Sequence, residues 1–221
     1  MNRVFVVMLA AIAVNVSGCA SFRDGSPSNI VVAASNAPAM ADGSTASPPP
    51  GFVGFCMHNL AACTGRTAGP TEVALDDQVK GILLTVNSQI NDEITYETDM
   101  EQFGVANRWS LDAVGGYGDC KAYALAKRQA LLAAGLPEGA LRIAIVRTPQ
   151  DELHAVLTVD TNAGNLVLDS LTSDIRPWSQ TDYVWLLRQS SDDPLRWVTL
   201  AETQNSQSES EPNLIGKILA H

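Results

Sequence analysis

Basic residues are scarce in this sequence, and they form no cluster. The chain of 221 residues has 14 lysine and arginine residues against 24 aspartate and glutamate residues, so its formal net charge at pH 7 is −10. A nucleic-acid-binding protein needs basic groups that neutralise phosphates, so the composition argues against a nucleic-acid partner. The acidic balance favours solubility and says little about the fold.

The N-terminal apolar run, residues 4–14, is too short for a mature membrane-spanning helix. Such a helix needs roughly 20 apolar residues. The run follows Arg3 and is followed by small residues that lead to Cys19, a pattern typical of an export signal. We therefore predict a signal peptide over residues 1–19.

The end of this segment, Val-Ser-Gly-Cys at residues 16–19, resembles a bacterial lipobox. In a lipobox the cysteine is lipidated and becomes the mature N-terminus, so the resemblance implies a lipid anchor on Cys19 and a location in the periplasm. Ala20 stands where inner-membrane lipoproteins typically carry aspartate, which favours the outer membrane. An ordinary cleaved signal with an incidental cysteine is the alternative.

The remaining chain divides by composition. Residues 20–50 are rich in serine, alanine, proline and glycine and almost uncharged, so we predict a flexible linker. Residues 204–221 begin with a polar stretch and are predicted to form a tail. Residues 51–203 have the length of one domain and contain no internal repeat.

Only four cysteines occur, and context separates them. Cys56 and Cys63 lie close together, so in an oxidising compartment they are expected to form a disulfide; two buried thiols are the alternative. A zinc site is disfavoured, because only His58 lies nearby and the spacing is not that of a zinc ribbon. Cys120 then remains unpaired, which makes it either an inert buried thiol or a reactive one.

Periodicity predicts helices first and strands afterwards. Apolar residues at helical spacing mark residues 79–90, and a second helix is expected to start at Cys120, with Asp119 as its N-cap. Short runs rich in valine, isoleucine and leucine follow and are separated by turn-forming residues. These runs cover residues 141–148, 153–160 and 165–171. They predict consecutive antiparallel strands, and the order of elements indicates an α+β fold.

Three side chains in this framework have the chemistry of nucleophilic catalysis. Cys120 is expected in the first turn of a helix, where unpaired N–H groups and the helix dipole favour a thiolate. His154, near the start of a strand, is the candidate base. Asp169, at the end of the next strand, is the candidate group that orients the imidazole. The hairpin register decides whether the last two meet, and the sequence leaves that register open.

The block around these residues resembles the bacterial transglutaminase-like cysteine peptidases, the family of LapG-like periplasmic proteases. The similarity covers GDCKAYALAKRQALLAAGLP, LHAVLTVDT and LVLDSL, and also VNSQIN, NRW, TDYVWLLRQS and the Cys56/Cys63 segment. It implies a papain-like or transglutaminase-like fold in which the helix that carries the cysteine packs on an antiparallel sheet. It also implies a Cys-His-Asp triad at Cys120, His154 and Asp169, and Trp109 as a candidate oxyanion donor beside its alternative as a core or cleft-wall residue.

One departure from the family concerns calcium. LapG-like members carry acidic residues immediately after the cysteine that take part in calcium binding, whereas this chain has Lys121 and Ala122. Calcium commonly takes six to eight oxygen ligands, so the change argues against the same site. No cofactor and no metal are therefore expected, and family-like regulation is in doubt.

The predicted function is that of a cysteine peptidase acting on a protein substrate in the periplasm or at the cell surface. The resemblance implies a surface adhesin as one such substrate. A transglutaminase or acyltransferase would use the same three residues and stays open as an alternative. So does a non-catalytic periplasmic binding lipoprotein on the same fold.

Overall fold

The computed structural model describes residues 29–30, 39–63, 69–111 and 116–200. The predicted signal peptide, the lipidation site Cys19 and the predicted tail over residues 204–221 lie outside this part. Within the described ranges, no helix combines the length and the apolar character that a membrane crossing requires.

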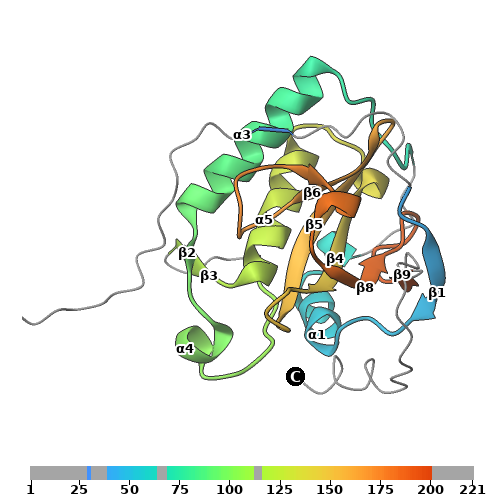
Figure 1. Ribbon diagram of the computed structural model, residues 1–221. Coiled ribbons are helices and arrows are strands. Elements are labelled where there is room, and N and C mark those ends of the chain that lie inside the picture. The colour runs from blue at the N-terminus through green and yellow to red at the C-terminus, as the bar shows by residue number, and fades with distance from the viewer. Residues whose placement is uncertain (1–28, 31–38, 64–68, 112–115, 201–221) are drawn as a thin grey trace, which may run out of the picture.

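A seven-stranded antiparallel sheet and two long helices form the framework (Figure 1). The helices are α1 Pro50–His58, α2 Leu60–Cys63, α3 Asp77–Glu93, α4 Asp99–Phe103 and α5 Cys120–Ala133. The strands of the sheet are β1 Asp42–Ala46, β4 Leu141–Arg147, β5 Leu153–Thr161, β6 Gly164–Leu168, β7 Arg176–Pro177, β8 Val184–Gln189 and β9 Trp197–Leu200. Strands β2 Thr95–Tyr96 and β3 Tyr117–Gly118 form a separate parallel pair, and 3-10 turns cover Glu138–Ala140 and Trp178–Gln180.

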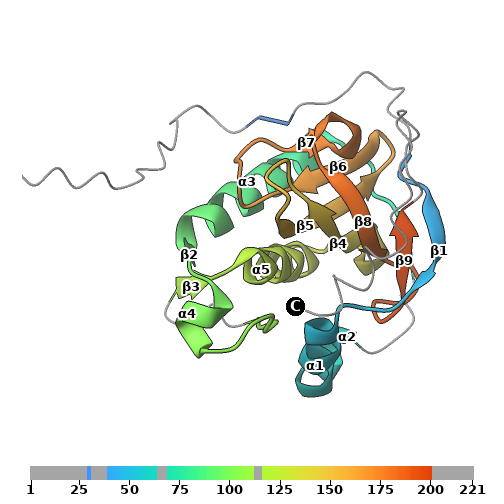
Figure 2. The same ribbon diagram turned by 60° about the horizontal axis from the view of Figure 1, so that its bottom comes forward.

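The sheet has the strand order β1-β9-β8-β4-β5-β6-β7. Strands β4, β5 and β6 are the consecutive antiparallel strands that the sequence predicts, with a tight turn between Thr161 and Gly164. Helix α5 packs on β4 and β5, and α3 lies against α5 (Figures 1 and 2). The predicted α+β fold, with the cysteine helix on an antiparallel sheet, is confirmed.

Helix α5 follows its sequence signals closely. Asp119 is the N-cap, and its side chain accepts a hydrogen bond from the backbone N–H of Lys121. The helix ends at Ala133, and Gly135 takes a positive φ of 89° that favours glycine. Leu125 and Leu131 of α5 are buried in the main core. The helix is thus fixed at both ends and along one face, which fixes the position of Cys120.

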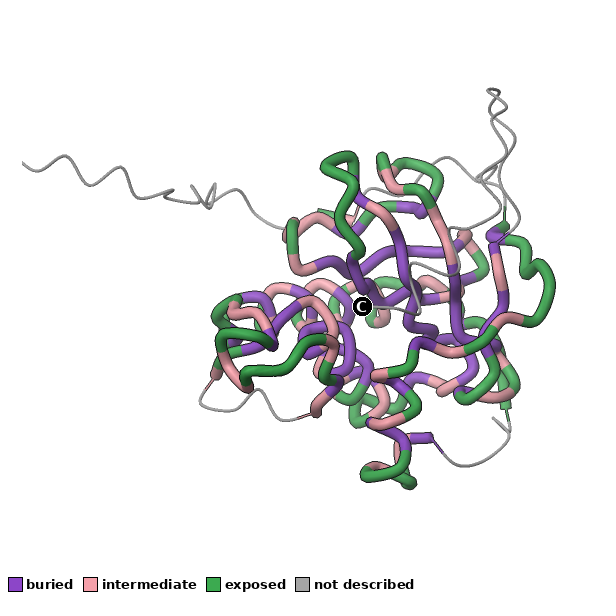
Figure 3. The backbone as a smooth tube through the Cα atoms, turned by 90° about the horizontal axis from the view of Figure 1, so that it is seen from below, coloured by how far each residue is buried: buried purple, intermediate pink, exposed green. Residues whose placement is uncertain are grey.

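Two apolar clusters cover the two sides of the sheet. The larger contains Leu83 of α3, Leu131 of α5 and alternate residues of the central strands such as Ile143 and Leu157. The smaller contains the intervening residues, for example Val156, together with Trp178. Strands buried on both sides read as nearly continuous apolar runs, which is the pattern of residues 141–146. Figure 3 shows buried backbone in the middle of the molecule and exposed segments toward its periphery.

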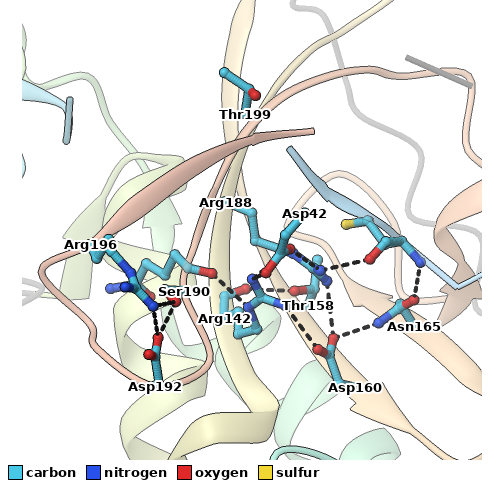
Figure 4. A network of polar contacts seen from close by, with 12 residues as sticks. Asp42, Arg142, Thr158, Asp160, Asn165, Arg188, Ser190, Asp192, Arg196 and Thr199 are labelled. Carbon is cyan, nitrogen blue, oxygen red and sulfur yellow. Dashed lines mark hydrogen bonds and ion pairs between the residues drawn. The ribbon is translucent and has the colours of Figure 1, made fainter. Parts of the chain in front are cut away.

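The expected linker over residues 20–50 is wrong at its C-terminal end. Asp42–Ala46 form β1, which pairs antiparallel with β9 at the edge of the sheet. The sequence DGSTA has no apolar pattern, so nothing local predicts a strand. Distant arginines hold it instead, because Asp42 pairs with Arg142 at 2.7 Å and Arg188 at 2.6 Å (Figure 4).

The predicted disulfide is present. Cys56 in α1 and Cys63 in α2 are bonded, with their Cα atoms 5.5 Å apart. Both cysteines are buried in the main core beside Phe52 and Phe55. The bond closes a short loop and holds the two short helices together, a constraint that suits helices too short to be stable alone.

Candidate active site

Cys120 is the first residue of α5, as the sequence predicts, and its side chain is half-buried. It is the one free cysteine in the described part of the chain. The chain reaches it through Gly118, where an added Cβ atom would lie 2.6 Å from the Cβ atom of Ala122. Glycine at this position therefore lets the incoming strand β3 pass close to the first turn of the helix.

His154 and Asp169 meet because of the register between β5 and β6. Leu157 of β5 pairs with Leu168 of β6, so Asp169, the next residue after β6, lies beside Val156. Val156 and His154 are two residues apart on β5 and therefore point to the same side of the sheet. The His154 Nε2 atom lies 2.8 Å from Asp169 Oδ1, and both side chains are buried. This settles the register that the sequence left open.

The imidazole also contacts the cysteine. His154 and Cys120 line the same cavity, and interaction with Cys120 is one of the causes that raise the pKa of His154. Because Nε2 faces Asp169, the ring nitrogen left for the thiol is Nδ1. The structure thus brings Cys120, His154 and Asp169 together, although they come from a helix, a strand and a strand end.

Asp169 is held by further groups that sequence reasoning missed. The Tyr183 hydroxyl donates to Asp169 Oδ2, and the Leu171 backbone N–H donates to Oδ1 at 3.0 Å. The Asn91 side chain, from α3, donates to the Asp169 backbone carbonyl at 2.9 Å. Asn91 and Tyr183 lie in the segments VNSQIN and TDYVWLLRQS. The family resemblance of these segments was the sequence signal that could have identified the two residues.

The electrostatics favour a charged imidazole. Burial alone lowers the pKa of His154, but the hydrogen bonds and charges of Asp169 and Cys120 outweigh it and raise the pKa to about 10. For Asp169, burial raises the pKa, but His154, the Leu171 N–H and Tyr183 oppose burial and hold the pKa below its usual value. The raised pKa of His154 and the lowered pKa of Asp169 both describe an imidazolium paired with a carboxylate.

The Cys120 and His154 side chains line a cavity of about 190 Å³. The other lining residues are mostly apolar: Pro49, Ala106, Asn107, Trp109, Lys121, Ile145, Leu153 and Ala155. A small, mostly apolar cavity beside a thiol and an imidazole suits a short stretch of peptide chain better than a charged ligand.

Trp109 forms part of the wall of this cavity. Its ring packs edge-on against Phe52 and Trp197, and its side chain is buried. The indole Nε1 donates to Asn107 Oδ1 at 3.3 Å. The core and cleft-wall placement that the sequence offered as the alternative is what the structure shows, and the oxyanion role stays a prediction.

Lys121 occupies the position where the family resemblance raised the question of calcium. Its Nζ lies 3.0 Å from Asp99 Oδ2 and also contacts Asp119 Oδ2. Ala122, the other departure, is buried and offers no ligand. An ammonium group between the two carboxylates does not fit a bound calcium ion, which needs oxygen ligands on all sides.

A half-exposed cysteine at a helix N-terminus, with a buried histidine and aspartate behind it, is the arrangement found in cysteine hydrolases and acyltransferases of the papain and transglutaminase type. The comparisons with known proteins agree. The family model for bacterial transglutaminase-like cysteine proteinases (BTLCP) matches residues 42–205, so the chain belongs to this family.

Solved structures of LapG from Legionella pneumophila are similar to this chain. The calcium-bound form is 30% identical, with 59% of this chain and 75% of that chain covered and a TM-score of 0.47. The EGTA-treated form is 29% identical, with 63% and 79% covered and a TM-score of 0.47. No curated protein matches the chain.

Proposed function

We propose that this chain is a peptidase that cleaves a protein substrate with Cys120 as nucleophile, His154 as acid and base, and Asp169 as the orienting group. The observation that carries the proposal is the buried imidazole that lines one cavity with Cys120 and is hydrogen-bonded to Asp169 Oδ1 at 2.8 Å. Membership of a cysteine proteinase family supports peptide hydrolysis as the reaction.

The geometry supports the following acyl transfer. His154 takes the proton of the Cys120 thiol as the sulfur attacks the peptide carbonyl carbon to form a C–S bond. The backbone N–H of Cys120, at the start of α5, is placed to stabilise the oxyanion, with Trp109 as a candidate second donor. His154 then protonates the leaving amine as the C–N bond breaks. Water hydrolyses the thioester, its proton passing to His154 and the sulfur leaving as thiolate.

Asp169 keeps the imidazole in position throughout the cycle. Oδ2 of the carboxylate accepts from Tyr183 and Oδ1 accepts from the Leu171 backbone N–H, while the backbone carbonyl of Asp169 accepts from Asn91. A fixed carboxylate sets which imidazole nitrogen faces the sulfur. Tyr183 and Asn91 act through Asp169 and are positioning residues.

Peptide cleavage and amine incorporation are the two reactions to compare. The purified protein is incubated with a candidate protein substrate, with and without a labelled primary amine, beside a Cys120→Ala control. Cleavage products that depend on Cys120 support the peptidase. Incorporation of the amine without cleavage would replace it by a transglutaminase.

A non-catalytic binding lipoprotein is separated from both by Cys120 reactivity. Iodoacetamide alkylates an accessible thiolate quickly near neutral pH. Rapid labelling of the folded protein supports a catalytic thiol, whereas labelling only after unfolding would favour the binding module.

We further propose that the substrate is a surface adhesin and that the enzyme is anchored through Cys19 in the periplasm, on the outer membrane. The lipobox resemblance at residues 16–19 and the family resemblance support these assignments. Radiolabelled palmitate should be incorporated by the wild type and not by a Cys19→Ser variant. Comparing surface proteins shed by cells with the wild type and with Cys120→Ala would identify the substrate.

A further inference from the structure

Three buried charged groups lie directly beside the nucleophile. Lys121, the residue after Cys120, has its Nζ 3.0 Å from Asp99 Oδ2 and in contact with Asp119 Oδ2. The exposed fractions of the three side chains are 13% for Lys121, 9% for Asp99 and 11% for Asp119. Two carboxylates so poorly hydrated would repel each other strongly without a cation between them.

Each carboxylate also fixes a piece of backbone. Asp119 Oδ1 accepts from the Lys121 N–H at 3.0 Å and so caps α5. Asp99 lies in the first turn of α4, and its Oδ2 accepts from the backbone N–H of Arg108. Arg108 adjoins Asn107 and Trp109, which line the cavity. The Lys121 ammonium therefore ties one cavity wall to the helix turn that carries Cys120.

The ammonium stays charged in this setting. Burial lowers the pKa of Lys121, but the charges of Asp119 and Cys120 and the hydrogen bonds to Asp119 and Asp99 outweigh burial and raise it. For Asp119, burial and the nearby Asp99 hold the pKa above its usual value, although Lys121 opposes them. Without Lys121, burial and the nearby Asp99 would favour protonation of Asp119 or displacement of its carboxylate.

We infer that Lys121 is a built-in cation that neutralises Asp99 and Asp119, positions the Cys120 turn, and makes the enzyme independent of a divalent metal. The statement on catalysis rests on the proposed peptidase function. The statements on cation binding and on the Cys120 turn do not. Lys121 is a positioning residue, because it acts through the helix cap and the cavity wall.

The first test concerns metal and needs no variant. The wild-type protein is treated with EGTA and then titrated with Ca²⁺ while binding heat, thermal midpoint and Cys120 alkylation are followed. We expect no binding heat, an unchanged midpoint, and alkylation rates that agree within about twofold, since the carboxylates already hold a cation. Loss of Cys120 reactivity in EGTA with recovery in Ca²⁺ would overturn the inference.

The second test changes the charge. Lys121→Gln should lower the thermal midpoint and slow Cys120 alkylation about tenfold at neutral pH, because the cap and the thiolate lose their neighbouring cation. Lys121→Arg keeps the charge and should recover most of the rate. The matched control is Lys80→Gln, which breaks an ion pair with the exposed Asp77 and should change neither quantity.

Two results would contradict the positioning role: equal alkylation of Lys121→Gln and wild type, or failure of Lys121→Arg to recover while Lys121→Gln stays folded. The two claims can fail separately. If no protein substrate is cleaved but alkylation still depends on the charge at position 121, the peptidase proposal fails and the inference about Lys121 stands.

Discussion

Two charge networks occupy opposite ends of β4 and β5, and they differ in whether they end on protein groups or at a cavity. At one end, Arg142 and Arg188 share the carboxylates of Asp42 and Asp160, and Asn165 bonds to Asp160 (Figure 4). At the other end, Asp169 and His154 lead to the Cys120 thiol. Arg142 is opposite Thr158 in the ladder, and Val146 is opposite His154, so one strand pair builds both.

The first network ends mainly on protein groups. Arg142 also donates to the Gln189 carbonyl, and Arg188 Nη2 donates to the Met40 carbonyl, whereas Arg188 Nε has no partner among the described residues and Asp42 is partly exposed. The second network ends at a half-buried sulfur on a cavity wall. Charge near this sheet therefore stabilises structure at the end where the arginines pair with protein carboxylates, and supports chemistry at the end where the last group faces a cavity.

Cys120→Ala should show the largest effect on activity. Removing the nucleophile is expected to lower kcat by at least about 10⁴-fold, because no other group in the cavity can form the thioester. The thermal midpoint should change little, since the side chain is small and half-buried. A steady-state assay with a melting curve on the same sample checks both. Ordinary turnover by this variant would remove Cys120 from the mechanism.

Asp169→Asn should lower kcat by roughly 10²–10⁴-fold, since the imidazole loses the partner that orients it. It should also change the pH profile. Asp169 helps to raise the pKa of His154 to about 10, so its loss moves the alkaline limb of kcat/KM to lower pH, by roughly 1–3 units. Tyr183→Phe, which leaves the carboxylate in place, is the milder control. An unmoved limb would show that Asp169 does not set the charge of His154.

The same pair links stability to pH. The raised pKa of His154 contributes stability that is fully present below its unfolded value of 6.5 and is lost as the pH rises through about 10. Unfolding free energies measured from pH 6 to pH 10 should therefore decline more for the wild type than for His154→Gln. Parallel curves would argue against the buried ion pair.

Arg188→Met should affect stability and spare chemistry. The arginine side chain is 1% exposed and pairs with Asp42 and Asp160, so its removal leaves two carboxylates short of a partner. We expect a loss in the free energy of unfolding below the roughly 3–5 kcal/mol of a fully buried pair, because Asp42 is partly exposed and Arg142 still pairs with both carboxylates. Activity per folded molecule should stay unchanged at low temperature. A variant of normal stability with impaired turnover would reverse the assignment of the two networks.

Lys127→Met should give the smallest effect, a gain in stability. Lys127 is fully buried on α5, and its Nζ has no hydrogen-bond partner among the described residues. Burial lowers its pKa to about 7 despite the opposing charge of Asp169, so the folded state resists protonation that the unfolded state accepts. Stability of the wild type should rise with pH between about 7 and 10 through this group. Methionine should remove that slope and add about 1–3 kcal/mol at pH 7, as denaturant titrations can measure.

Much of the fold was predictable because its signals are local. Asp119 as N-cap, the helix from Cys120 and the three strands after it follow from capping, periodicity and turn residues over short windows. The Cys56–Cys63 bond was predictable because the two residues are near in sequence. β1 was not, because its sequence carries no strand pattern and its partners, Arg142 and Arg188, lie about a hundred residues or more away.

The sequence by itself determined which residue types were available for catalysis and where on their elements they lie: a cysteine opening a helix, a histidine on a strand and an aspartate at a strand end. Only the tertiary structure decided that β5 and β6 pair in the register that joins His154 to Asp169, and that Asp99 reaches Lys121 beside Cys120. The reason is physical. Capping and periodicity are set by neighbours along the chain, whereas the meeting of distant charges depends on how helices and strands pack around a common core.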